Sequence, residues 1–312
     1  MRTVLITLIL FISLSLGSLA FSQGKPQETQ VIGQIFGSPV PIGNYYFIKS
    51  ALMVFGNRWG GQIKTAEELE SAIWEQLVLS FEAFRRNIVV SIEEREQEIT
   101  KMLEGEKVSF DWKKNKEEFA KWVKEKTGEE AELFENQISH LLQLQKLRNQ
   151  VMEGMSPAVT EEESHEAFVN EQSSIELELV QFEEENAAKD FYNKVSKVAK
   201  SWDDEKVKSL DKFKRPGFVT LVFLIDFWKI AEDDLYKMMK MEAGSIYPPA
   251  PIYKGFAVFK VLNKKAADEA NYPKMKYSYH DKVAAMKKYE GLSQWIKKLK
   301  EDANITIYRQ GG

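Results

Sequence analysis

The chain has 312 residues, 44% of them hydrophobic and 12% aromatic, so it can build one or two packed cores and is not disordered as a whole. Its formal net charge is -4 and its basic residues are interspersed with acidic ones, which disfavours binding to nucleic acid through phosphate contacts. It has no cysteine, and its histidines lie far apart in the sequence, so thiol chemistry, disulfides and a zinc site built from neighbouring ligands are excluded.

The first 22 residues have the layout of a secretory signal peptide. Arg2 supplies a positive start, an apolar run extends over 4–19, and the small residues Ala20 and Ser22 follow it. The run is short for a membrane anchor, and no basic cluster comes after it. We therefore expect residues 1–22 to be a cleavable signal peptide and the mature protein to be periplasmic.

The stretch that follows predicts a small hairpin and then helices. Residues 31–40 read as two short strands joined by a tight turn at Gly37, Ser38 and Pro39. Apolar residues at steps of three and four, two of the runs starting with capping boxes, then predict four helices. Their marker residues are Thr65 with Glu68, Ser91 with Glu94, Phe119 with Trp122, and Phe134 with Ile138.

The pattern changes after Pro157. A capping box at Thr160 and Glu163 starts a short helix, and strands then alternate with helices. The predicted order is a strand over 175–182, a helix over 183–202, a buried strand over 218–225, a helix over 231–241 and a strand over 256–262. This order is typical of a small α+β domain.

A long helix is predicted from about Tyr279 to Lys300, followed by a β-like piece over 305–308. A single helix cannot bury its own apolar stripe, so this one is expected to pack on the N-terminal helices. The predicted fold class is therefore α+β. It consists of a split all-helical domain, made of the N-terminal helices and the C-terminal helix, with an inserted α+β domain.

Several motifs occur in a characteristic order. Val159–Glu163 reads Val-Thr-Glu-Glu-Glu, Gly244–Ile246 precedes a strand ending at Leu262, and Leu292–Ile307 forms the closing helix and strand. Upstream, Phe119–Glu135 carries a Phe-x-x-Trp-Val…Thr-Gly…Phe-Glu pattern. Together these stretches resemble the SurA, PpiD and PrsA family of envelope chaperones, which carry a parvulin-type isomerase module.

The resemblance implies a domain plan for the whole chain. The expected ranges are 1–22 for the signal peptide, 23–158 for a SurA-like N-terminal helical chaperone domain, 159–264 for a parvulin-like domain, and 265–312 for a C-terminal helix and strand that pack back on the N-terminal domain. Parvulin modules carry one histidine in the first strand and another in the last. Here the strand over 175–182 has none, Ala257 stands at the second position, and Asp226 is the nearest acid. The module is therefore expected to be degenerate.

The resemblance further implies a chaperone or holdase for unfolded or outer-membrane polypeptides of the envelope. Its expected partners are unfolded or nascent envelope polypeptides, with transient proximity to the membrane and without nucleic acid, metal or small-molecule cofactor. No catalytic residue is assigned. The residues expected to contact a bound peptide are Leu179, Phe218, Met238, Met239, Phe256 and Ala257.

Two alternatives stay open at this point. One is an active peptidyl-prolyl cis-trans isomerase with an atypical site, because the twisting of a peptide bond in a shaped apolar pocket does not strictly need a general base. The other is a non-catalytic envelope scaffold with one dedicated partner.

Overall fold

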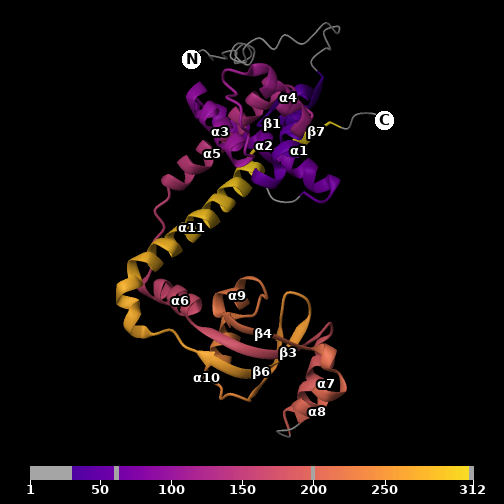
Figure 1. The fold of residues 1–312 in the computed structure, drawn as a ribbon, viewed down its shortest axis with the longest axis vertical. Helices are drawn as coiled ribbons and strands as arrows, with labels where there is room; N and C mark the ends of the chain where they lie inside the picture. Colours follow the sequence, from indigo (N-terminus) through magenta and orange to yellow (C-terminus); the bar gives the residue numbers. More distant parts are fainter. Residues whose placement is uncertain (1–29, 60–62, 198–200, 309–312) are drawn as a thin grey trace, which may run out of the picture. The chain divides into compact units, whose positions relative to one another are not determined.

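The computed structural model describes residues 30–59, 63–197 and 201–308, which divide into two compact units (Figure 1). The terminal unit consists of the described residues up to Val151 and from Ser293 onward. The inserted unit is Met152–Leu292. The expected signal peptide lies outside the described residues. No helix within the described ranges has the length and apolar character that a bilayer crossing needs.

The terminal unit combines helices with a small antiparallel sheet of strand order β2-β1-β7. The fold class described this domain as all-helical, which the sheet corrects; its strands correspond to the hairpin predicted over 31–40 and the β-like piece predicted over 305–308. Its elements are β1 (Val31–Ile35), β2 (Ser38–Pro41), α1 (Ile42–Trp59), α2 (Ala66–Arg85), α3 (Ile92–Gly105), α4 (Lys116–Thr127), the part of α5 (Ala131–Glu153) up to Val151, the end of α11 (Tyr272–Asp302) and β7 (Thr306–Ile307).

Local signals fix several helix ends in this unit. The capping boxes at Thr65 and Ser91 start α2 and α3 as predicted, each with its reciprocal glutamate three residues on. The helix α4 stops at Gly128, which adopts the left-handed conformation at φ 77°. The helix α1 was not predicted, because it follows the β2 strand directly and has no capping box to mark its start.

The hairpin between β1 and β2 turns one residue earlier than the sequence suggests. Phe36 and Gly37 form the turn, with φ values of 52° and 73°, and Ser38 already pairs with Ile35. Two consecutive left-handed residues match the twist of a two-residue hairpin. Ser38 and Pro39, expected in the turn, therefore belong to β2.

The C-terminal residues complete the core of the terminal unit. The Phe36 amide donates to the Ala303 carbonyl at 2.7 Å, and the Tyr308 amide donates to the Ile32 carbonyl at 2.9 Å. Gly33 permits this approach, because a Cβ atom there would lie 2.3 Å from the Thr306 carbonyl oxygen. Ala303 is fully buried in the same cluster as the β1 side chains.

The inserted unit is built on an antiparallel sheet of strand order β4-β3-β6-β5. Its strands are β3 (Ser174–Phe182), β4 (Phe213–Thr220), β5 (Ile246–Pro251) and β6 (Phe256–Lys265). Its helices include α6 (Glu161–Gln172), α7 (Glu185–Val195), α8 (Ser201–Lys208), α9 (Leu221–Asp226), α10 (Glu232–Lys240) and α11 up to Leu292, with short 3-10 turns at Leu210–Lys212 and Glu269–Asn271.

Two predicted elements of this unit differ in the structure. The helix expected over 183–202 is two helices, α7 and α8. The buried strand expected over 218–225 is the end of β4 followed by α9. Thr220 makes the change from strand to helix, because its hydroxyl accepts from the Phe223 amide at 3.3 Å and caps α9.

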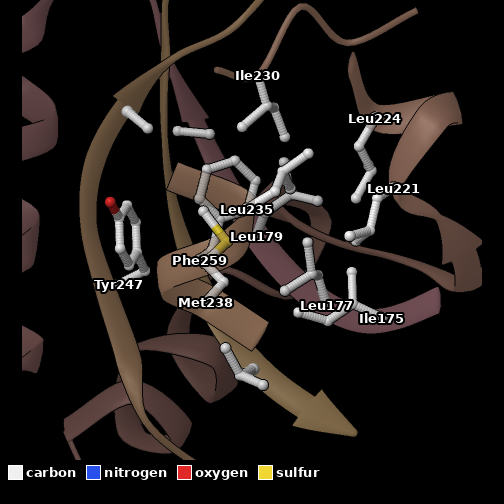
Figure 2. Packing of buried hydrophobic residues seen from close by; sticks show 13 residues of the cluster. Ile175, Leu177, Leu179, Leu221, Leu224, Ile230, Leu235, Met238, Tyr247 and Phe259 are labelled. Carbon is white, nitrogen blue, oxygen red and sulfur yellow. The ribbon is translucent and has the colours of Figure 1, made fainter. Parts of the chain in front are cut away.

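Each face of the sheet is covered by its own pair of helices. The first face packs Leu177 and Leu179 of β3 and Phe259 of β6 against α9 and α10, and Figure 2 shows these side chains pointing toward one another. The second face packs Val180 and Val258 against α7 and α8. Alternate residues of a strand point to opposite faces, so the apolar alternation of β3 supplies both cores.

A buried polar contact supports the second face. Glu178 is 4% exposed, accepts a hydrogen bond from the Trp202 indole Nε1 at 2.6 Å, and pairs with Lys206. Glu178→Ala would leave the buried indole N–H without its acceptor, so we expect the free energy of unfolding of the inserted unit to fall by about 2 kcal/mol. Urea unfolding followed through the Val180 and Val258 methyl resonances measures this loss.

Glu176→Ala is the matched control on the same strand. Glu176 bonds to the exposed Arg215 at 2.8 Å, so its removal should cost less than about 1 kcal/mol. An equal loss in the two variants would contradict the role given to the buried contact.

Candidate polypeptide-binding surface

The sheet face that carries Ala257 is closed. Ala257 is fully buried beside Leu177, Leu179 and Phe259, each at most 1% exposed. The helices α9 and α10 cover these residues with Leu224, Leu235 and other apolar side chains (Figure 2). Tyr247 of β5 lies in the same cluster, and its hydroxyl donates to an Asp234 carboxylate oxygen at 2.7 Å. Ala257, the position where the family resemblance puts the second histidine, thus lies in a closed core.

The histidines of this chain stand on helices and not on the sheet. His140 lies on α5, His165 on α6 and His280 on α11. The His165 Nε2 atom lies 2.8 Å from a Glu269 carboxylate oxygen, a contact that ties α6 to the 3-10 turn ahead of α11. Within the described ranges, no three histidine, aspartate or glutamate side chains gather as metal ligands would.

The residues expected to contact a peptide do not form one surface. Leu179, Met238 and Ala257 lie inside the first core, and Met239 is half-buried at its edge. Phe256 packs on the opposite face, against the cluster that holds Val180. Phe218 is 52% exposed on the outer strand β4, opposite Glu176.

Both edges of this sheet are protected against an added strand. The edge strand β5 contains Pro248, Pro249 and Pro251, which have no N–H to donate. The other edge strand, β4, contains Pro216, and its register with β3 shifts between Leu177 and Leu179. A polypeptide that binds this unit is therefore expected to use side-chain contacts rather than strand pairing.

The inserted unit exposes a stacked pair of aromatic rings outside the sheet. Phe223 of α9 and Phe227, the residue that follows α9, stack with ring centroids 4.8 Å apart and are 39% and 67% exposed. Tyr253, in the turn between β5 and β6, is 69% exposed. Its amide donates to the Trp228 carbonyl at 2.7 Å, which ties this turn to the end of α9. We call Phe223, Phe227 and Tyr253 the aromatic patch.

The scaffold under the aromatic patch is well packed. Leu221 and Leu224 anchor α9 in the first core, so the stacked rings stand on a helix whose inner face is fully buried. The turn that carries Tyr253 depends on Gly255, which has φ 85° and whose Cβ would lie 2.1 Å from the Phe182 carbonyl oxygen. Exposed rings on a fixed support lose little conformational freedom when a partner covers them.

Sequence reasoning missed the aromatic patch because residues 218–225 were interpreted as a strand. The available signal was Thr220 as a helix cap, followed by phenylalanines four residues apart, at 223 and 227. In a helix this spacing places both rings on one side. The predicted strand ended at residue 225, so it did not include Phe227.

No protein-family model matches the sequence, and a search of curated proteins finds no match. Solved structures do match. One of two structurally related SurA-like chaperones of Campylobacter jejuni covers 90% of this chain and 99% of its own, at 15% identity and a TM-score of 0.39. The isomerase PrsA of Bacillus anthracis covers 75% of this chain and 97% of its own, at 18% identity and a TM-score of 0.41.

The foldase PrsA of Streptococcus pneumoniae covers 90% of this chain and 96% of its own, at 14% identity and a TM-score of 0.33. These three structures are of one SurA-like chaperone and two PrsA proteins, each less than 20% identical to this chain.

Proposed function

We propose that the mature chain is a periplasmic chaperone that holds unfolded envelope polypeptides, without catalysing the isomerisation of their prolines. The observation that carries the proposal is the aromatic patch, whose stacked and exposed pair of rings stands on a well-packed support beside a closed core. The signal-like first 22 residues and the order of the family motifs support the compartment and the kind of client.

The proposal assigns a part to each unit. The terminal unit, made from both ends of the chain, is the chaperone domain, and the inserted unit is a degenerate parvulin-like domain. Client binding by the inserted unit then uses exposed side chains around α9. Phe218 and Met239 are further candidate contacts, whereas Leu179, Met238 and Ala257 support the patch from inside the core.

The strength of such contacts suits a reversible holdase. A client that covers about 60 Å² of each stacked ring gains about 1.5 kcal/mol per ring at ~25 cal/mol per Å². Two rings then contribute about 3 kcal/mol, which corresponds to about a hundredfold in affinity. Contacts of this size let a client bind weakly at each place and leave again.

The double variant Phe223→Ser with Phe227→Ser is therefore expected to bind an unfolded polypeptide about a hundredfold more weakly. The measurement is the fluorescence anisotropy of a labelled, permanently unfolded envelope polypeptide titrated with the mature chain. The matched control is Tyr277→Ser with Tyr289→Ser, which removes two rings of α11 that are 79% and 65% exposed in the same unit. Equal losses of affinity in both double variants would show that the aromatic patch has no specific role in client binding.

The two alternatives predict different results. An isomerase with an atypical site would speed the cis-trans exchange of an X-Pro peptide above its uncatalysed rate, which NMR exchange spectroscopy detects. A scaffold with one dedicated partner would bind a single folded protein and would leave several unrelated unfolded polypeptides unbound. We expect the uncatalysed rate in the first experiment and comparable binding of several unfolded polypeptides in the second.

A further inference from the structure

A pocket opens among four helices of the terminal unit, with a volume of about 150 Å³. It belongs to the terminal unit, whereas the aromatic patch belongs to the inserted unit. The lining residues come from α1 (Val54 and Phe55), α3 (Met102), the residue after α3 (Glu106), α4 (Trp122, Lys126 and Thr127) and α5 (Phe134).

The inner wall of the pocket is aromatic. Phe55 and Phe134 are 3% and 1% exposed, and their ring centroids lie 5.4 Å apart. The Trp122 ring stands nearly perpendicular to that of Phe134, at 83° with the centroids 6.2 Å apart. Trp122 and Met102 are only half-buried, so part of each side chain faces the opening. A ring that enters the opening would therefore contact Trp122 and Met102, with the buried phenylalanines behind them.

The polar groups at the opening already have partners within the protein. Lys126 pairs with Glu106, its Nζ 3.3 Å from the carboxylate, so the two charges offset each other. The Thr127 hydroxyl donates to the Val123 carbonyl at 2.8 Å and accepts from the Glu129 amide at 3.1 Å. The opposite charges of Lys126 and Glu106 leave the rim without net charge, so the rim complements a neutral occupant.

The size of the pocket limits the size of the group that can enter it. An apolar cavity of ~150 Å³ in another protein takes up benzene. We propose that this pocket binds one aromatic side chain of an unfolded polypeptide, whose backbone passes over the rim formed by Glu106 and Lys126. The choice of a polypeptide as the source of the ring rests on the function proposed above. The terminal unit thereby has a binding element of its own.

The test uses the full mature chain and NMR of its Val54 and Met102 methyl groups. The first probe is a soluble Gly-Ser peptide with one central phenylalanine, and the second is the same peptide with alanine at that place. We expect saturable shifts of both methyl resonances with the first peptide and affinity at least tenfold weaker with the second. A third probe, N-acetylphenylalanine amide, supplies the ring without a chain.

Val54→Trp fills the pocket and should weaken binding of the phenylalanine peptide at least tenfold, read from the Met102 methyl. Met53→Trp is the matched control, since Met53 is the neighbouring residue of α1, is 72% exposed and does not line the pocket. If Val54→Trp alters the methyl spectrum of the whole unit, Met102→Trp replaces it, with Val54 as the reporter.

Three results would overturn the proposal. They are the absence of saturable shifts in the unaltered chain, equal binding of the phenylalanine and alanine peptides, and unchanged binding after the pocket is filled. Binding of N-acetylphenylalanine amide without binding of the peptide would overturn the polypeptide as occupant. The variant Phe223→Ser with Phe227→Ser leaves the pocket residues unchanged. If this variant loses client binding but its Val54 and Met102 methyl groups still shift with the phenylalanine peptide, the loss comes from the aromatic patch and not from the pocket.

Discussion

Ala257→His is expected to destabilise the inserted unit by about 3 kcal/mol and to leave prolyl isomerisation at its uncatalysed rate. Ala257 is fully buried in the same core as Leu179 and Phe259, with the side chains of α9 and α10 packed against it. Overpacking this core costs about 1–3 kcal/mol, and an imidazole without a hydrogen-bond partner adds about 1–3 kcal/mol. Urea unfolding followed through the Leu177 and Leu179 methyl resonances measures the loss, and exchange spectroscopy on an X-Pro peptide measures the rate.

Asn263→His provides the control for this prediction. Asn263 lies on the same strand, β6, but at its exposed end, so the free energy of unfolding should change by less than about 0.5 kcal/mol. A stable Ala257→His variant that accelerates exchange would contradict the description of this face as a closed core, and would favour the isomerase alternative.

Acidification is expected to destabilise the terminal unit through His140. Its Nε2 atom is buried and has no hydrogen-bond partner among the described residues, and its ring meets Phe47 edge-on at 5.5 Å. Burial, and after it the positive charge of Arg148, lowers the pKa of His140 from 6.5 to about 4. The unfolded chain therefore takes up this proton at a higher pH than the folded chain.

The sign and size of the effect follow from that difference in pKa. The contribution of neutral His140 is fully present above pH 6.5 and is lost as the pH falls from 6.5 to 4, because only the unfolded state is protonated in that range. At 1.36 kcal/mol per pKa unit the total loss is about 3 kcal/mol. Urea unfolding at a series of pH values, read from the Leu144 and Leu147 methyl resonances, gives the slope.

His140→Leu should remove this part of the slope, so the difference between the two chains isolates it from the titration of the carboxylates. The control is His280→Leu on α11, where the ring is exposed and the slope of the terminal unit should stay unchanged. Identical slopes in the unaltered chain and in His140→Leu would contradict the assignment of the pH dependence to His140.

The sequence predicts the local elements whose cause is itself local. Capping boxes at Thr65, Ser91 and Thr160 begin helices where reciprocal hydrogen bonds satisfy free amides, and these contacts lie within four residues. The alternation over 175–182 predicts β3 for a similar reason, since the strand period depends only on neighbouring residues. These predictions are confirmed.

The candidate surface depends on distant contacts, which the pattern of residues does not contain. Alternation shows that Leu179 and Ala257 share a face with their apolar neighbours, but the helices that close this face come from residues 221–240. Met238 was expected at a peptide-binding edge for the flexibility of its thioether, whereas packing against β6 places it in the core. The sequence did not predict the exposed rings at 223 and 227, because it did not predict α9.

The most direct test of the central claim is light scattering from a urea-unfolded outer-membrane β-barrel protein diluted into buffer with the mature chain. The chaperone account predicts that near-stoichiometric chain suppresses the rise in scattering, and that Phe223→Ser with Phe227→Ser suppresses it much less. Scattering that rises equally with and without the chain would contradict the account.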